Sequence, residues 1–285
     1  MPVFLTEDNR NLVYFLIITF TFSWFLWLPS LLASFGLIES LTIFGLLRII
    51  GSFGPLVGAF SLTSYYEGLT GVRILWNRAW HFNKWPFLLI AILLLPILNL
   101  LSLWLAVITE GLVFPRLSIW DDYMFILINF IFFFFIAGPF QEEFGWRGYA
   151  LDKIQSNWNA LESSMVLGSI WSLWHLPLFY ISGTPQSNSS FFSFTFTVIL
   201  LSIVYTWLYN NTNGSILVAM IFHAVNNISN SLFPLNDTLF GYAYYTILLD
   251  LAVVIILIIY GPKNLVRKST RMDIRNYRKY ERLIQ

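Results

Sequence analysis

Residues 141–148 read Gln-Glu-Glu-Phe-Gly-Trp-Arg-Gly, directly after an apolar run that extends from Phe125 to Phe140. Carboxylates are costly to hold near hydrocarbon, so a pair of them at the end of such a run indicates a function. Successive residues of a helix lie about 100° apart, so Glu142 and Glu143 face different sides. Glu143 and Arg147 are spaced i,i+4 with the acid first, the favourable order for an ion pair. The stretch therefore predicts a membrane helix whose end holds one paired carboxylate and leaves Glu142 available for chemistry.

The composition around this stretch is that of an integral membrane protein. The chain has 285 residues, of which 57% are hydrophobic and 11% charged, and its mean hydropathy is +0.69. Soluble domains contain about 25% charged residues. The net charge of +1 gives no bulk attraction to nucleic acid, so no nucleic-acid partner is expected. Cysteine is absent, which excludes disulfides, thiolate metal sites and a cysteine nucleophile.

Hydropathy predicts an all-α fold, a bundle of about eight transmembrane helices, because a span needs about 20 apolar residues. We expect a single integral-membrane domain over residues 1–285 in contact with the lipid bilayer. The expected spans are 11–34, 42–65, 86–108, 123–140, 162–182, 191–209, 214–233 and 242–260. The fourth is expected to break at Gly138-Pro139, because proline disrupts helical hydrogen bonding.

Charges in the loops predict the orientation of the bundle. An even number of spans places both termini on one side of the membrane. The C-terminal tail, about 262–285, contains eight Lys or Arg residues between Lys263 and Arg282. The positive-inside rule therefore predicts that both termini are cytoplasmic, in the cell membrane if the host is prokaryotic.

Two of the three histidines, His175 and His223, lie within predicted spans. Ionisable residues at such positions usually face a cavity or a partner and are candidates for a functional site. His223 and Asn227 are spaced i,i+4, so one helix face presents an imidazole and an amide together. His175 precedes Pro177, where helical hydrogen bonding loosens.

Glu142, His175, His223 and Asn227 form a hydrolytic set. A carboxylate and an imidazole can deprotonate a water and protonate a leaving amine. An imidazole and an amide can donate hydrogen bonds to an oxyanion. Glu142, His175 and His223 could also hold a catalytic zinc ion, and residue types alone do not separate the two chemistries. No cofactor is therefore assigned, and zinc stays open.

Two non-hydrolytic interpretations compete with this one. The polar residues could be hydrogen-bonding contacts between helices of a scaffold. Glu142 and the histidines could instead form the proton relay of a transporter, although no internal repeat supports this. The H-E-x-x-H and G-x-S-x-G motifs of other proteases are absent.

Three motifs resemble those of the CPBP intramembrane endopeptidases, which include the type II CAAX prenyl proteases and bacteriocin-processing proteins. The resemblance covers a motif core of about 120–235, and tryptophan replaces the usual phenylalanine of the second motif. The motifs are Glu142-Glu143-x-x-x-Arg147, Trp171-x-x-x-His175 and His223-x-x-x-Asn227.

The resemblance implies an endopeptidase that hydrolyses membrane-associated peptide or protein substrates, including prenylated CAAX-type ones. It implies that Glu142 and His175 activate water, and that His223 and Asn227 stabilise the oxyanion. Glu143 and Arg147 would support the site. The alternative within the same fold is a non-proteolytic bacteriocin-immunity or scaffold protein. The hydrolytic interpretation requires that Glu142, His175 and His223 converge in one cavity open to the cytoplasm, and it fails if they lie more than about 10 Å apart with no single pocket between them.

Overall fold

The computed structural model describes residues 7–82, 84–117 and 123–267, and this part of the chain contains helices and loops without β-strands. The predicted all-α class is therefore confirmed. Most of the predicted basic tail lies outside the described residues. The long helices are α1 (Glu7–Ser34), α3 (Gly54–Arg78), α4 (Trp85–Glu110), α9 (Phe191–Asn211), α10 (Ile216–Leu232) and α11 (Gly241–Tyr260). The shorter ones are α2 (Ile43–Gly51), α5 (Tyr123–Ile136), α6 (Pro139–Gly145), α7 (Leu151–Gln155) and α8 (Ala160–Trp174).

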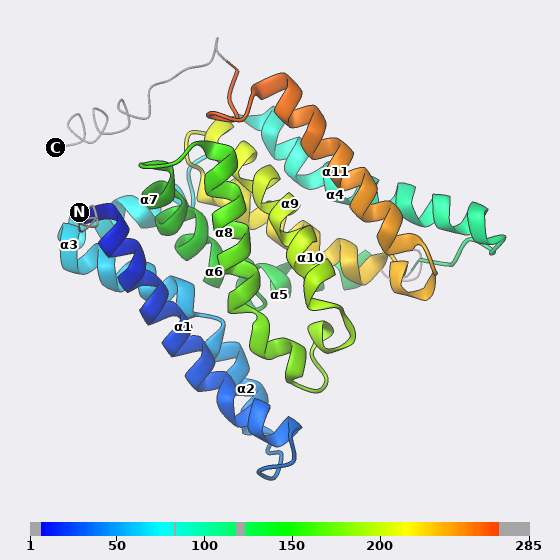
Figure 1. Ribbon diagram of the computed structural model, residues 1–285, viewed down its shortest axis with the longest axis horizontal. Helices are drawn as coiled ribbons and strands as arrows, with labels where there is room; N and C mark the ends of the chain where they lie inside the picture. Colours follow the sequence, from blue (N-terminus) through cyan, green and yellow to red (C-terminus); the bar gives the residue numbers. More distant parts are fainter. Residues whose placement is uncertain (1–6, 83, 118–122, 268–285) are drawn as a thin grey trace, which may run out of the picture.

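The helices form two flanks around a central group (Figure 1). Helix α1 packs along α2 and α3 on one flank, and α11 packs along α4 on the other. Helices α5 to α10 lie between the flanks and contain the three motifs. The motif residues thus lie in the part of the bundle between the two flanks.

Contacts at the helix ends show how the chain runs. Asp8 at the start of α1 pairs with Lys153 of α7, and the amide of Asn211 at the end of α9 donates to the carbonyl of Leu265. At the opposite end, the carboxylate of Glu110, the last residue of α4, accepts a hydrogen bond from the backbone of Phe240 before α11. The Ala160 amide at the start of α8 donates to the Lys263 carbonyl, so the start of α1 and the residues after α11 both lie near α7 and the start of α8.

The number of full-length spans is smaller than the eight predicted. Six helices of the described chain are long and apolar enough to cross a membrane, or seven if the bent α2–α3 pair is one span. The predicted span 162–182 differs because α8 has only 15 residues. Pro177 ends the α-helix, and a 3-10 helix over Leu176–Tyr180 continues from it.

The predicted break at Gly138-Pro139 is confirmed, because α5 ends at Ile136 and α6 begins at Pro139. Gly138 has φ +123°, a backbone conformation that side chains with a Cβ rarely adopt. The Gln141 side chain accepts a hydrogen bond of 2.9 Å from the Gly138 amide and so caps α6. A π-helical turn, η2 (Trp146–Ala150), joins α6 to α7. The break directs the two glutamates of α6 into the centre of the bundle.

Small residues let neighbouring helices approach the motif helices closely. A methyl group on Gly145 of α6 would overlap Pro55 of α3, and one on Gly168 of α8 would lie 2.9 Å from the Ile199 backbone of α9. Such contacts between backbones are typical of helix packing in membranes. They fix the helices that hold the motif side chains.

Candidate active site

Glu143 and Arg147 form the ion pair that their spacing predicts. The Arg147 Nη1 atom lies 3.0 Å from Glu143 Oε1 and 3.1 Å from Glu143 Oε2. Both side chains are fully buried, so the pair is shielded from solvent. An isolated charge at this depth would be strongly unfavourable, which makes each partner necessary for the other.

Glu143 has a second partner that the sequence did not reveal. His223 Nδ1 lies 2.7 Å from Glu143 Oε1. An ionised carboxylate only accepts hydrogen bonds, so Nδ1 of His223 is the donor. Glu143 therefore joins the first motif on α6 to the third motif on α10 and fixes the plane of the His223 ring.

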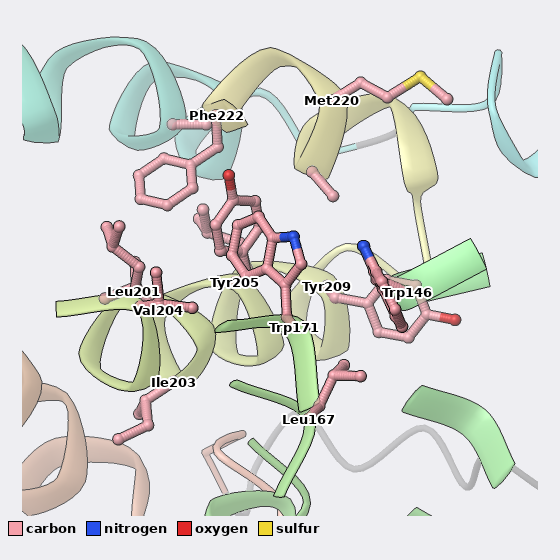
Figure 2. Close-up of a cluster of buried hydrophobic side chains, with 14 of the residues drawn as sticks. Trp146, Leu167, Trp171, Leu201, Ile203, Val204, Tyr205, Tyr209, Met220 and Phe222 are labelled. Atoms are coloured by element: carbon pink, nitrogen blue, oxygen red, sulfur yellow. The ribbon is translucent and has the colours of Figure 1, made fainter. Parts of the chain in front are cut away.

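Two aromatic rings complete the environment of Arg147. Among the described residues, the Nε and Nη2 atoms of Arg147 have no hydrogen-bond partner, and the guanidinium carbon lies 3.8 Å from the centre of the Tyr205 ring. The Trp171 ring is 4.5 Å away. A guanidinium over an aromatic face is attracted by the ring quadrupole. Tyr205 and Trp171, side by side in Figure 2, thus stabilise the part of the cation that Glu143 does not reach.

Glu142 lies on the other side of α6, as the helical spacing predicts. Its Oε2 atom accepts a hydrogen bond of 2.7 Å from the indole Nε1 of Trp171. A methyl group on Gly138 would lie 2.9 Å from Glu142 Oε1 and 3.3 Å from His223 Nε2. Both atoms therefore face the same small space beside Gly138, which a side chain with a Cβ would fill.

His175 is the C-cap of α8 and joins the cluster through Trp171. Its Nδ1 atom lies 2.9 Å from the Trp171 carbonyl oxygen. A carbonyl only accepts, so Nδ1 carries the hydrogen and Nε2 is the atom that can take up a proton. The His175 ring also packs against Trp174 and Phe194.

Asn227 lies one helical turn after His223 on α10, as predicted. Its Nδ2 atom donates a hydrogen bond of 3.0 Å to the Ala137 carbonyl, next to the break between α5 and α6. An amide group has two N–H donors, so a second hydrogen is available for a ligand. Five of the predicted site residues, Glu142, Glu143, Arg147, His175 and His223, are thus linked by contacts with one another or with Trp171, and Asn227 lies one turn after His223.

Comparisons with known proteins match the part of the chain that contains the cluster. Residues 124–229 match the family model described as Type II CAAX prenyl endopeptidase Rce1-like, and this range includes all three motifs. This is a membrane-bound endopeptidase that is similar over its motif core to the Rce1-like family. The chain is also 27% identical over 234 residues to "CAAX prenyl protease 2" of Methanococcus maripaludis, an alignment that covers 79% of this chain and 85% of the relative.

The zinc alternative depends on where three ligand residues lie in this Rce1-like chain. Among the described residues, no group of three or more His, Cys, Asp or Glu side chains is placed to hold a metal ion. Glu142, His175 and His223 therefore do not fit a three-ligand zinc site in this arrangement.

Two surface cavities of this Rce1-like chain lie away from the cluster. A cavity of about 450 Å³ is lined by Asp8, Glu67 and Lys153 among others, at the end where α1 begins. Another, of about 370 Å³, lies in the loop from Phe179 to Asn188. Neither is lined by the motif side chains. Glu142, His175 and His223 are at most 9% exposed, so only a small part of each faces outward.

Three features of the site were not predicted from the sequence. The hydrogen bond from Trp171, the ring of Tyr205 and the space beside Gly138 all depend on how α6, α8, α9 and α10 pack. Trp171 belongs to the second motif, but it was expected there as an aromatic residue and not as a donor. A hydrogen bond between residues 29 positions apart leaves no signal in the spacing of one chain.

Proposed function

We propose that this endopeptidase hydrolyses peptide bonds of membrane-associated proteins, with prenylated CAAX-type C-terminal peptides as its substrate class. The description of the matching family model and the name of the relative support this substrate class. The observation that supports the hydrolytic chemistry best is that one residue, Trp171, contacts both Glu142 and His175. The indole of Trp171 orients the Glu142 carboxylate and its backbone carbonyl orients the His175 imidazole, and both side chains are buried.

The first step is activation of a water by Glu142 and His175. Glu142 has one oxygen engaged by the indole and the other, Oε1, directed to the space beside Gly138. His175 has Nδ1 engaged by a carbonyl and Nε2 available. The two groups can share the proton of an attacking water and later deliver it to the leaving amine.

The second step is stabilisation of the tetrahedral oxyanion by His223 and Asn227. The His223 Nδ1–H is committed to Glu143, so Nε2 can donate only if the ring is protonated at both nitrogens. Asn227 adds its second amide hydrogen. Preorganised donors of this kind often provide the largest single contribution to catalysis.

Glu143 and Arg147 support the site without contacting the substrate. Glu143 orients His223, and Arg147 neutralises Glu143 while lying on the rings of Trp171 and Tyr205. Removal of either residue is expected to shift His223 and Trp171 together.

The proposal includes the placement of the protein in the membrane. The chain forms one integral-membrane domain, with both termini in the cytoplasm. The clustering of Asp8, Lys153 and Lys263 at one end of the bundle supports a common side for the two termini. The basic residues of the tail support the cytoplasmic side.

The experiment is a cleavage assay with purified protein in lipid nanodiscs. Two peptides of one sequence, with and without a prenyl group on the C-terminal CAAX cysteine, are incubated with the parent and with His175→Ala, and the products are identified by mass spectrometry. We expect cleavage of the prenylated peptide by the parent alone. Equal cleavage of both peptides would refute the substrate class. If a folded parent cleaves neither these peptides nor a broad peptide library, the bacteriocin-immunity or scaffold alternative is favoured.

A further inference from the structure

Trp171 makes four contacts with the groups that act in the proposed reaction. Its indole Nε1 donates to Glu142 Oε2 at 2.7 Å, and its carbonyl accepts from His175 Nδ1 at 2.9 Å. Its ring meets the His223 ring edge to face, with centroids 5.4 Å apart. The Arg147 guanidinium lies 4.5 Å from the same ring. Through these contacts Trp171 links Glu142, His175 and His223 directly.

The hydrogen bond to Glu142 has the geometry of a strong one. Its length of 2.7 Å is at the short end of the range for bonds to ionised acceptors. Glu142 and Trp171 are both buried, so water does not compete for this contact. An indole has one N–H donor and no acceptor, so toward the carboxylate it can only donate a hydrogen bond.

The hydrogen bond from Trp171 also determines which oxygen of the Glu142 carboxylate is available to accept a proton. Because Oε2 accepts from Trp171, the oxygen directed to the space beside Gly138 is Oε1. Arg147 and Tyr205 on the ring of Trp171 restrict its rotation. The orientation of Glu142 is thus set by the orientation of the indole.

We infer that Trp171 is a positioning residue, whose indole N–H holds Glu142 in the orientation that accepts the proton of the attacking water. This inference rests on the proposed role of Glu142. Phenylalanine at this position would preserve the ring contacts with His223 and Arg147 and the backbone contact with His175. It would remove the hydrogen bond to the carboxylate together with one ring of the indole, and the loss of ring volume therefore needs its own control.

The test compares Trp171→Phe with two tryptophan controls in the cleavage assay. Trp174 and Trp207 are both buried, and neither indole nitrogen has a hydrogen-bond partner in the part of the chain that the structure describes. Trp174→Phe controls for loss of ring volume beside His175, and Trp207→Phe for loss of volume far from the site. We expect kcat to fall about 10- to 100-fold in Trp171→Phe with KM changed by less than about threefold, because a hydrogen bond to a charged group is lost. Trp207→Phe should match the parent.

A spectroscopic measurement reads the hydrogen bond independently of activity. In protein labelled with ¹⁵N-tryptophan, the indole N–H signal that is missing from Trp171→Phe belongs to Trp171. We expect Glu142→Gln to shift this signal and to leave that of Trp207 in place. The inference is overturned if Glu142→Gln leaves the Trp171 signal unchanged, or if Trp171→Phe and Trp174→Phe lower kcat equally. Cleavage by Glu142→Gln at the parent's rate would instead overturn the proposed function, even where the signal shifts.

Discussion

At the scale of single residues, Glu143 is the group on which the geometry of the site most depends. It accepts hydrogen bonds from Arg147 and from His223, and its side chain is fully buried. A charge in this position is tolerated only because it is paired and hydrogen-bonded. The pairing of Glu143 also explains why Glu142, its neighbour in sequence, has different partners.

The first prediction concerns the strength of this ion pair. Glu143→Gln leaves the Arg147 guanidinium buried without its anion and should lower the free energy of unfolding by about 3–5 kcal/mol. The matched control is Asp8→Asn, which removes the partly exposed pair between Asp8 and Lys153 and should cost at most about 1 kcal/mol. Denaturant unfolding in detergent measures both. Equal costs in the two variants would contradict the account.

The second prediction concerns the space beside Gly138. In Gly138→Ala the new methyl group would lie 2.9 Å from Glu142 Oε1 and would fill the space to which this oxygen is directed. We expect kcat to fall about 100-fold, because small displacements in a site have effects of this size. The control is Gly68→Ala, which also places alanine at positive φ but has open space around it. Gly68→Ala should reduce stability and keep kcat, and retention of kcat in Gly138→Ala would count against the site.

The sequence predicted part of the site at this scale, for a physical reason. The Glu143–Arg147 pair and the shared face of His223 and Asn227 follow from the helical repeat, which is a local property. The contact of Trp171 with Glu142 joins residues 29 positions apart and depends on the packing of α8 against α6. Spacing along one chain does not specify such packing.

At the scale of elements, the way α8 begins and ends determines where His175 lies. Asn159 caps its first turn by accepting a hydrogen bond of 3.0 Å from the Glu162 amide. Pro177 stops it after 15 residues, so His175 is at a helix end rather than in the middle of a span. Hydropathy predicted a span over 162–182 because apolar residues continue past the proline. The length of an apolar run does not report where hydrogen bonding of the helix stops.

The third prediction concerns the start of α8. Asn159→Ala should lower stability by about 1 kcal/mol, the usual cost of losing an N-cap, and leave kcat unchanged. Ser190→Ala at the start of α9 is the control, since its capping hydrogen bond is longer, at 3.5 Å. Thermal unfolding of the two variants in nanodiscs provides the comparison. A cost for Ser190→Ala that equals or exceeds that of Asn159→Ala would show that these caps do not act as described.

At the scale of the whole molecule, the described chain begins and ends on the same side of the bundle. Contacts of residues 8, 153, 160, 211 and 265 define that end. Hydropathy predicted eight spans, whereas six helices of the described chain, or seven if the bent α2–α3 pair is one span, are long and apolar enough to cross a membrane. Hydropathy locates the loops, and the loops reverse the direction of the chain from one helix to the next. The lengths of individual helices do not follow from it.

The fourth prediction concerns the orientation in the membrane. The chain has no cysteine, so single cysteines can be introduced without background. Lys263→Cys should react with a membrane-impermeant maleimide only from the cytoplasmic side. Val113→Cys, which replaces a 92% exposed residue after α4, should react only from the other side. Labelling of both positions from one side would contradict the arrangement of passes, and labelling of Lys263→Cys from outside would contradict the orientation.

The most direct test of the central claim is the turnover number of Glu142→Gln on the prenylated peptide. Glutamine preserves the shape of the side chain and an oxygen for Trp171, but it cannot take the proton of the water. Glu162→Gln, on the first turn of α8 and outside the motifs, is the control and should match the parent. We predict that kcat of Glu142→Gln falls at least about 100-fold while KM changes little, as expected for loss of a general base. A kcat within about threefold of the parent's would show that Glu142 does not activate the water.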